Sequence, residues 1–195
     1  MTAKDDQHGR KRPRFHTVIR KILVYVAALA LVIAAQPAPI PFTIGCIVIA
    51  AGLLLRIWAF GHLAKNRELV TSGPYAHTRN PGYVGSALVG SGLFLAGGNA
   101  TTATGIGIWI AGLLAVAWFT LCYLPRKYRV EYTRLEADFG NDAREHAANV
   151  PDFWPRLRPW PNRRRNRFSW ARISDNTEWA WAPLCCLALG LMWLG

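Results

Sequence analysis

Residues suited to chemistry are concentrated in two polar segments, the first of which spans residues 69–85. It reads LVTSGPYAHTRNPGYVG, with two tyrosines, a histidine and an arginine among turn-forming residues. Its Gly-Pro pair predicts a turn, and Asn80-Pro81 predicts the end of the loop, with Pro81 in the first turn of the next helix. The polar residues of such a loop could carry chemistry. A tight turn with an aromatic anchor at the start of a membrane helix would have the same composition, so both interpretations stay open.

The second polar segment, residues 126–140, reads RKYRVEYTRLEADFG. It predicts a helix that leaves a membrane and ends at Gly140, a residue type common just after the last helical turn. Lys127 and Glu131 are four residues apart and therefore share one face of that helix. A carboxylate at this place can offset the charge of a cationic ligand. The alternative is a solvated amphipathic helix with a surface ion pair.

The positions of cysteine and histidine argue against metal and redox chemistry. All four cysteines fall in apolar stretches, none forms a CxxC pair, and the adjacent pair has poor geometry for a disulfide. The five histidines are scattered and form no cluster with the spacing of zinc or iron ligands. We therefore predict no metal site. The residues concerned are Cys46, Cys122, Cys185 and Cys186, with His8, His16, His62, His77 and His146.

The composition combines 52% hydrophobic residues with a net charge of +12, from 23 Lys and Arg against 11 Asp and Glu in 195 residues. The two properties are separated along the chain. Residues 82–124 and 179–195 contain no charged residue, and residues 22–60 contain only Arg56. A soluble domain needs no such stretches, whereas a membrane-spanning helix needs about 20 apolar residues. We predict an all-α integral membrane protein without a nucleic-acid partner, in which Arg56 either extends to the membrane surface or faces a site.

Proline and glycine clusters divide the apolar stretches into about five membrane-spanning helices. All 23 Lys and Arg residues then fall on one side of the membrane, and the turns at 36–41 and 98–103, which lack them, fall on the other. By the positive-inside rule, the N-terminus is cytoplasmic and the C-terminus lies outside the cell membrane. The spans are expected at residues 18–36, 41–60, 82–97, 104–124 and 179–195.

Five regions follow from this arrangement. The basic run RRRNRFSW at 163–170 carries aromatic residues and is expected to lie on anionic lipid at the cytoplasmic face. The regions are a basic tail at 1–17, a transmembrane hairpin at 18–60, a core at 61–155, a basic membrane-surface segment at 156–178 and a C-terminal transmembrane helix at 179–195.

The order of the motifs resembles that of a known family. The loop LVTSGPYAHTRNPGYVG is followed by EYTRLEADFG and then by Val150-Pro151. Over residues 45–155 this pattern resembles the isoprenylcysteine carboxyl methyltransferase-like family, part of a wider group that includes the membrane phospholipid methyltransferases. The resemblance implies that the core at 61–155 is a methyltransferase that uses S-adenosylmethionine, bound in a pocket at the cytoplasmic face. It also implies an amphiphilic acceptor, such as a lipid or a prenylated molecule, that enters from the bilayer.

The resemblance carries over to individual positions, none of which acts as an acid or base. Substrate contacts match Lys127 and Arg79. Gly90-Ser91-Gly92 matches a cofactor element of the phospholipid methyltransferases, although its glycines fit helix packing equally well. The cofactor positions match Arg67, Glu68, Leu69, Val70, Tyr75, Asn80, Pro81, Gly82, Tyr83 and Glu131.

Three positions depart from the family pattern. Asn80 stands where histidine is usual and cannot titrate near neutral pH. Tyr132 replaces the second of two adjacent glutamates. Lys127 replaces an arginine, which keeps the charge but loses the fork that binds a carboxylate through two hydrogen bonds. The alternatives are therefore a phospholipid N-methyltransferase, a thiol S-methyltransferase, or a non-catalytic membrane adaptor that binds anionic lipid.

Overall fold

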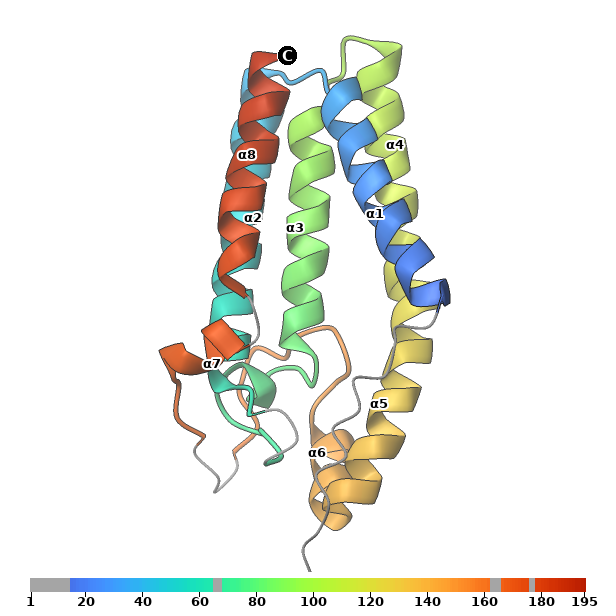
Figure 1. The fold of residues 1–195 in the computed structure, drawn as a ribbon. Helices are drawn as coiled ribbons and strands as arrows, with labels where there is room; N and C mark the ends of the chain where they lie inside the picture. Colours follow the sequence, from blue (N-terminus) through green and yellow to red (C-terminus); the bar gives the residue numbers. More distant parts are fainter. Residues whose placement is uncertain (1–14, 65–67, 162–165, 176–177) are drawn as a thin grey trace, which may run out of the picture.

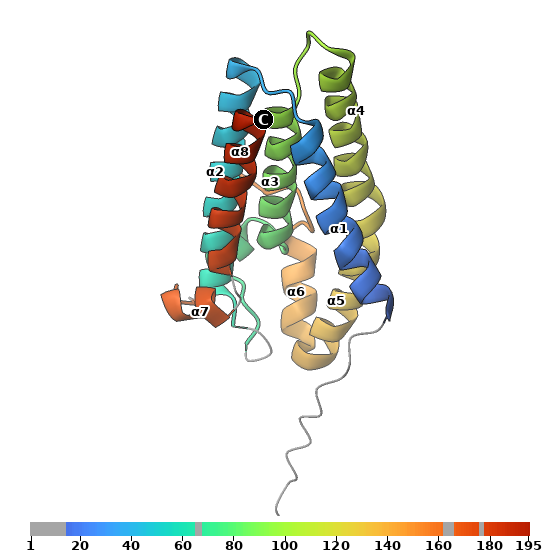
Figure 2. The same ribbon diagram turned by 45° about the horizontal axis from the view of Figure 1, so that its top comes forward.

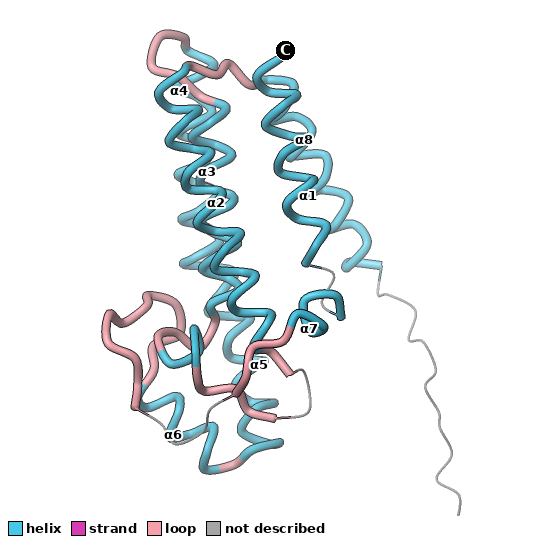
Figure 3. The backbone as a smooth tube through the Cα atoms, turned by 90° about the vertical axis from the view of Figure 1, so that its left-hand side faces the viewer, coloured by secondary structure: helices cyan, strands magenta, loops and turns pink. Residues whose placement is uncertain are grey.

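The structure is a computed structural model that describes residues 15–64, 68–161, 166–175 and 178–195. The described residues form helices and loops without a strand (Figures 1 and 3), as expected for an all-α chain. The longer helices are α1 (Phe15–Ala34), α2 (Pro39–His62), α3 (Pro81–Gly97), α4 (Ala103–Trp118), α5 (Leu124–Phe139), α6 (Asn141–Asn149) and α8 (Trp181–Leu194). Shorter elements are η1 (Gly73–Ala76), the π-helical η2 (Phe119–Tyr123), α7 (Trp170–Asp175) and η3 (Glu178–Ala180).

Five helices form an elongated bundle of two layers. Helices α1 and α8 lie in front of α2, α3 and α4 in Figure 1, and the turned view in Figure 3 shows the same separation. Helix α6 and the polar loops gather at one end, below the bundle (Figure 2). Helices α2 and α3 therefore place the polar loop between them at the same end of the bundle as α5 and α6.

Glycines allow α2 and α3 to pack backbone against backbone. A Cβ atom on Gly45 would lie 2.6 Å from the carbonyl oxygen of Gly92, and one on Gly52 would lie 2.8 Å from that of Gly85. A side chain at any of these positions would force the helices apart. Helix packing was one of two interpretations of Gly90, and it is wrong for this residue, which has open space beside it.

Prolines mark the first turns of both α2 and α3. Helix α3 begins at Pro81, as predicted. Helix α2 begins at Pro39 and includes Pro41, two residues earlier than expected. The first-turn N–H groups of a helix have no partner within the helix, so proline loses little there.

Helices α4 and α5 form one continuous helix through η2. Pro125 lies in the first turn of α5 and would normally clash with the carbonyl of Leu121, one turn earlier. Leu121 lies in the wider π-helical turn Phe119–Tyr123, which relieves this clash and lets the helix continue. The predicted fourth span and the helix carrying Glu131 are therefore a single element.

The outer surface of the bundle is apolar. Ile33, Leu113 and Leu121 remain 76%, 72% and 74% exposed. Two helices, Pro39–His62 and Ala103–Phe139, are long and apolar enough to cross a membrane, and Ile22–Ala34 and Glu178–Leu194 are shorter apolar helices. An exposed apolar surface of this extent fits association with a membrane. The other three spans stay predictions.

The two turns without Lys or Arg meet at the end of the bundle opposite the polar loops. The backbone N–H of Gln36 donates to the carbonyl of Gly97 at 2.7 Å, and Asn99 Nδ2 donates to the carbonyl of Gln36 at 2.6 Å. The C-terminal end of α8 lies at this end too (Figure 1). The turns at 36–41 and 98–103 thus lie together at one end of the bundle.

Candidate functional site

The end of the polar loop meets the helix that carries Glu131. The Tyr83 hydroxyl donates to Glu131 Oε1 at 3.0 Å, and Lys127 Nζ lies 3.0 Å from the same oxygen. The Tyr83 and Tyr128 rings lie 5.8 Å apart. The Lys127 and Glu131 side chains are 40% and 38% exposed, so this carboxylate is open to a ligand. Two of the predicted cofactor positions and one predicted substrate position therefore form one cluster.

Tyr75 lies in η1, within range of the charge of Glu131. It is half-buried, and burial together with the negative charges of Glu131 and Glu178 raises the pKa of its hydroxyl above the ordinary value. The phenol is therefore neutral at physiological pH. Gly73 begins η1 with φ of +61°, and a Cβ atom there would lie 2.7 Å from His62 Nε2. Only glycine fits this turn, because a side chain at this φ would be strained and would clash with His62.

Backbone pairing holds the rest of the loop. The N–H of Arg79 donates to the carbonyl of Pro151, that of Arg156 to the carbonyl of His77, and that of Trp160 to the carbonyl of Ala76, each at 2.9 Å. The segment at 151–160 therefore runs antiparallel beside the loop at 76–79. The sequence did not predict this pairing, because it joins two irregular segments about 80 residues apart.

Helix α6 supports the loop from the other side. Its buried His146 lies with Nε2 2.8 Å from the carbonyl of Tyr75, and neutral imidazole can donate this hydrogen bond. Burial lowers the pKa of His146, the charge of Arg79 lowers it further, and the hydrogen bond opposes them. Neither α6 nor this role of His146 was predicted, since the nine residues Asn141–Asn149 are mostly polar and have only alanines as apolar residues.

The remaining predicted cofactor positions do not lie together at Glu131. Leu69 and Val70 are buried, as is Pro81. Asn80 donates through Nδ2 to the carbonyl of Asp152 at 3.0 Å, and the Gly82 carbonyl accepts from Arg56 at 3.4 Å. These residues shape the loop rather than present a polar group at Glu131. Arg67 lies outside the described residues.

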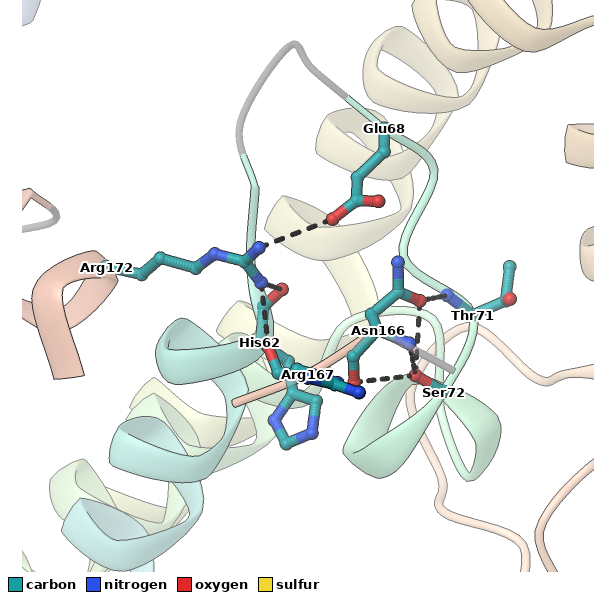
Figure 4. Close-up of polar contacts among 7 residues, drawn as sticks. All are labelled: His62, Glu68, Thr71, Ser72, Asn166, Arg167 and Arg172. Carbon is teal, nitrogen blue, oxygen red and sulfur yellow. Dashed lines mark hydrogen bonds and ion pairs between the residues drawn. The ribbon is translucent and has the colours of Figure 1, made fainter. Parts of the chain in front are cut away.

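The segment at 166–172 is attached to the beginning of the loop (Figure 4). Arg172 lies 3.5 Å from Glu68 Oε1 and donates to the carbonyl of His62 at 2.9 Å. Asn166 Oδ1 accepts from the Ser72 hydroxyl at 3.1 Å and from the Thr71 N–H at 3.3 Å. Glu68 therefore pairs with Arg172 in a region distinct from the Lys127–Glu131 cluster.

Arg56 is buried in an ion pair, so the expectation that it extends to the membrane surface is wrong. Its guanidinium binds Glu178 through Nε at 3.0 Å and Nη2 at 2.9 Å, contacts Ser86, and lies 4.4 Å from the Trp181 ring centroid. Glu178 was missed. Its only sequence signal is an acidic residue directly before the uncharged stretch at 179–195.

Arg79 lies beside Tyr132, on a different face of α5 from Lys127. It forms an ion pair with Asp152, and its guanidinium lies 5.6 Å from the Tyr132 ring. The two predicted substrate residues are therefore not brought together. Among the described residues, no three His, Cys, Asp or Glu side chains lie close enough to hold a metal ion.

Comparison with known proteins identifies the family. Residues 40–141, just over half of the chain, match the phospholipid methyltransferase family. The chain is 35% identical over 121 residues to the cobalt-zinc-cadmium resistance protein CzcN of Cupriavidus metallidurans. That alignment covers 61% of this chain and 51% of CzcN, so the chain spans about half the length of this relative. No solved structure matches. The match includes the polar loop and Glu131 and confirms the wider group predicted from the motifs: the chain belongs to the phospholipid methyltransferase family.

Proposed function

We propose that the protein is a multi-pass membrane methyltransferase that transfers a methyl group from S-adenosylmethionine to an amphiphilic acceptor. The observation that carries this proposal is the contact of Tyr83 and Lys127 with Glu131, which lies inside the family match. It joins a polar loop to a helix 48 residues away at an open carboxylate. An isolated surface ion pair would not need the tyrosine contact.

The residues of the cluster fit the proposed cofactor. S-adenosylmethionine carries a sulfonium cation and an amino group, either of which Glu131 can bind or offset. Tyr83 offers a flat ring beside this carboxylate, of the kind that an adenine ring can pack against, and Tyr75 lies within range of its charge. When bound, the cofactor supplies an activated methyl group whose sulfur leaves as a neutral thioether. The chain itself contributes alignment and exclusion of water.

The acceptor follows from the family and from Lys127. Phospholipid methylation is the activity in the name of the matched family, and it favours a lipid amine. A prenylcysteine carboxylate is less well supported, because the Lys127 ammonium is already paired with Glu131 and lacks the fork of an arginine. An amine acceptor must lose a proton before it attacks. Asn80 cannot accept it, so we assign no general base.

The membrane arrangement completes the proposal. The five spans leave the Glu131 cluster on the cytoplasmic side together with all the Lys and Arg residues, and the C-terminus outside. The basic residues after Arg156 then contact anionic lipid.

Labelling of single cysteines in a cysteine-free chain tests this membrane topology. A cysteine at Thr101 should be labelled from outside intact cells, and one at Glu136 only after lysis.

Cofactor binding tests the methyltransferase assignment. Calorimetry on the full chain in nanodiscs should show S-adenosylmethionine binding, and Glu131→Gln should weaken it about tenfold or more, because a charge-assisted contact is lost. Glu136→Gln is the matched control. Glu136 lies on the same helix and pairs with Arg144 at 2.6 Å, away from the cluster. No binding by the wild-type chain would refute the enzyme and favour the lipid-binding adaptor.

The product identifies the acceptor. Membranes incubated with methyl-labelled donor should yield label in lipid that survives base treatment, as an N-methyl group does. Base-labile label would indicate a carboxyl ester instead. Label in a small-molecule fraction would indicate a soluble thiol or amine and would contradict the amphiphilic acceptor.

A further inference from the structure

A cavity of about 460 Å³ lies on the face of α5 turned towards Arg79. Its walls come from the polar loop, from the junction of η2 with α5, from the end of α6 and from the segment after Pro151. The residues that matter here are Arg79, Tyr128, Arg129, Asp152, Thr120 and Phe153. Lys127 is not among the lining residues. The volume is in the range of sites that hold small molecules or lipid headgroups.

Two buried donors at this cavity lack hydrogen-bond partners within the described part of the chain. One is the hydroxyl of Tyr128, a residue only 8% exposed, and the other is Nε of Arg79. Asp152 and Arg79 lie close enough to the Tyr128 hydroxyl for their charges to act on it. Buried polar groups are nearly always paired, and an unpaired one lowers stability. Two such donors at one cavity indicate a ligand that accepts from both.

The charges of the lining select the kind of acceptor atom. Arg79 and Arg129 provide two cations, against the single carboxylate of Asp152. Asp152 is already engaged by a terminal nitrogen of Arg79, which leaves Nε free. Arginine Nε–H can only donate, and tyrosine can donate to an anion. The missing partner is therefore a hydrogen-bond acceptor, and the excess of cations in the lining favours an anionic one.

The other side of the cavity leads to the apolar surface. Thr120 lies in η2, and its hydroxyl already donates to the carbonyl of Val116 at 2.8 Å, so it does not compete for the ligand. The neighbouring Leu121 is 74% exposed. A molecule with its anionic group between Arg79 and Tyr128 can thus extend an alkyl chain along α4 towards the bilayer.

We infer that this cavity binds the anionic group, phosphate or carboxylate, of the amphiphilic acceptor. The inference rests on the proposed function and specifies its substrate class. It assigns the anion to Arg79, Tyr128 and Arg129 and leaves Lys127 with Glu131 on the cofactor side. For a phospholipid amine, the phosphate binds here and the amine extends from it towards the Glu131 cluster.

Binding of dodecyl phosphate to the full chain in dodecyl maltoside tests the inference without methyl transfer. Tyr128→Phe removes one hydroxyl and should weaken dodecyl phosphate about tenfold, while the unfolding temperature without ligand stays the same or rises. Arg79→Lys keeps the charge, removes the Nε donor and should weaken binding similarly. The matched control is Tyr25→Phe on α1, where the ring is 70% exposed. It changes no charge and should bind like the wild type.

The outcomes separate this site from the cofactor site. Equal dodecyl phosphate affinity in Tyr128→Phe and Tyr25→Phe would overturn the inference. So would a Tyr128→Phe chain that loses S-adenosylmethionine affinity but keeps dodecyl phosphate, because the anion would then be the carboxylate of the donor. If neither the wild type nor any variant binds S-adenosylmethionine, the proposed function fails. A tenfold loss of dodecyl phosphate in Tyr128→Phe would still establish the anion site.

Discussion

Arg56 and Lys127 each pair with a glutamate, in very different surroundings. The Arg56 and Glu178 side chains are 8% and 5% exposed, lie 122 residues apart in the chain and share two hydrogen bonds. The Lys127 and Glu131 side chains are 40% and 38% exposed, lie one helical turn apart and meet at a single oxygen. Arg56 also has aromatic rings on two sides, Phe60 at 5.1 Å and Trp181 at 4.4 Å.

The difference separates a structural pair from one available to a ligand. Removing one partner of a buried pair leaves an uncompensated charge, which is costly. An open pair adds little stability and can exchange its partner for a bound molecule. Arg56 with Glu178 therefore holds α8 against α2, whereas Glu131 stays accessible, as the proposed cofactor site requires.

The largest effect is expected for Glu178→Gln. It leaves Arg56 buried without a counter-charge and should lower the free energy of unfolding by about 3–5 kcal/mol. Thermal unfolding of the full chain in detergent measures this. The double variant Arg56→Met, Glu178→Leu has no buried charge and should recover most of the loss. A single variant as stable as the wild type would show that the pair is open to water.

Gly85→Ala should disturb the same pair through packing. A Cβ atom at Gly85 would lie 2.6 Å from Cγ of Arg56 and 2.8 Å from the carbonyl oxygen of Gly52. The overlap should lower the free energy of unfolding by about 1–3 kcal/mol. Gly90→Ala on the same helix enters open space and should raise it by up to about 1 kcal/mol, by helix propensity alone. Equal effects of the two substitutions would contradict the close approach of α2 and α3.

Acid should weaken the loop support by α6 independently of both ion pairs. Unfolded His146 takes up a proton near its ordinary pKa of about 6.5, whereas the pKa of folded His146 is lowered by burial. Its contribution to stability is therefore complete above about pH 6.5 and is lost as the pH falls towards the lowered value. Unfolding temperatures at pH 7.5 and 5.5 should differ less in His146→Gln than in the wild type. Glu178→Gln is the control: it leaves His146 unchanged, so the part of this temperature difference that His146 causes should remain.

The smallest stability effect is expected for Lys127→Met. An exposed pair one turn apart contributes about 0.5 kcal/mol or less, and salt screens it further. Unfolding at low and high ionic strength should therefore show a small difference from the wild type that vanishes in high salt. A loss of several kcal/mol would place Lys127 with Arg56 among the structural residues and would contradict the comparison.

Local features of the fold and site were predictable from sequence. The pairing of Lys127 with Glu131 follows from helical periodicity, the start of α3 from Pro81, and the end of α5 from Gly140, whose φ is +53°. Each depends on residues within a turn or two. The contact between Tyr83 and Glu131 was not predicted, because no local rule joins residues 48 positions apart; the family resemblance only placed both among the cofactor positions.

The features that were missed depend on tertiary contacts. Glu178 meets Arg56, His146 meets the carbonyl of Tyr75, and Asn166 binds Ser72, all across large separations in sequence. A lone charged or polar residue carries no sign of its distant partner. The passage of the helix through Pro125 was missed for another reason: proline normally ends a helix, and only the π-helical turn before it permits continuation.

The unbroken helix from Ala103 to Phe139 fixes how far Glu131 lies beyond the apolar layer. At 1.5 Å per residue it is about 55 Å long, against about 30 Å for the hydrocarbon core of a bilayer. Glu131 follows Tyr123 by eight residues, which is about 12 Å along the axis. The helix therefore sets the distance between the apolar layer and Glu131. With the methyl donor at Glu131, as proposed, the reacting group of an acceptor must stand about that far from its tail, and a shorter headgroup should not be methylated.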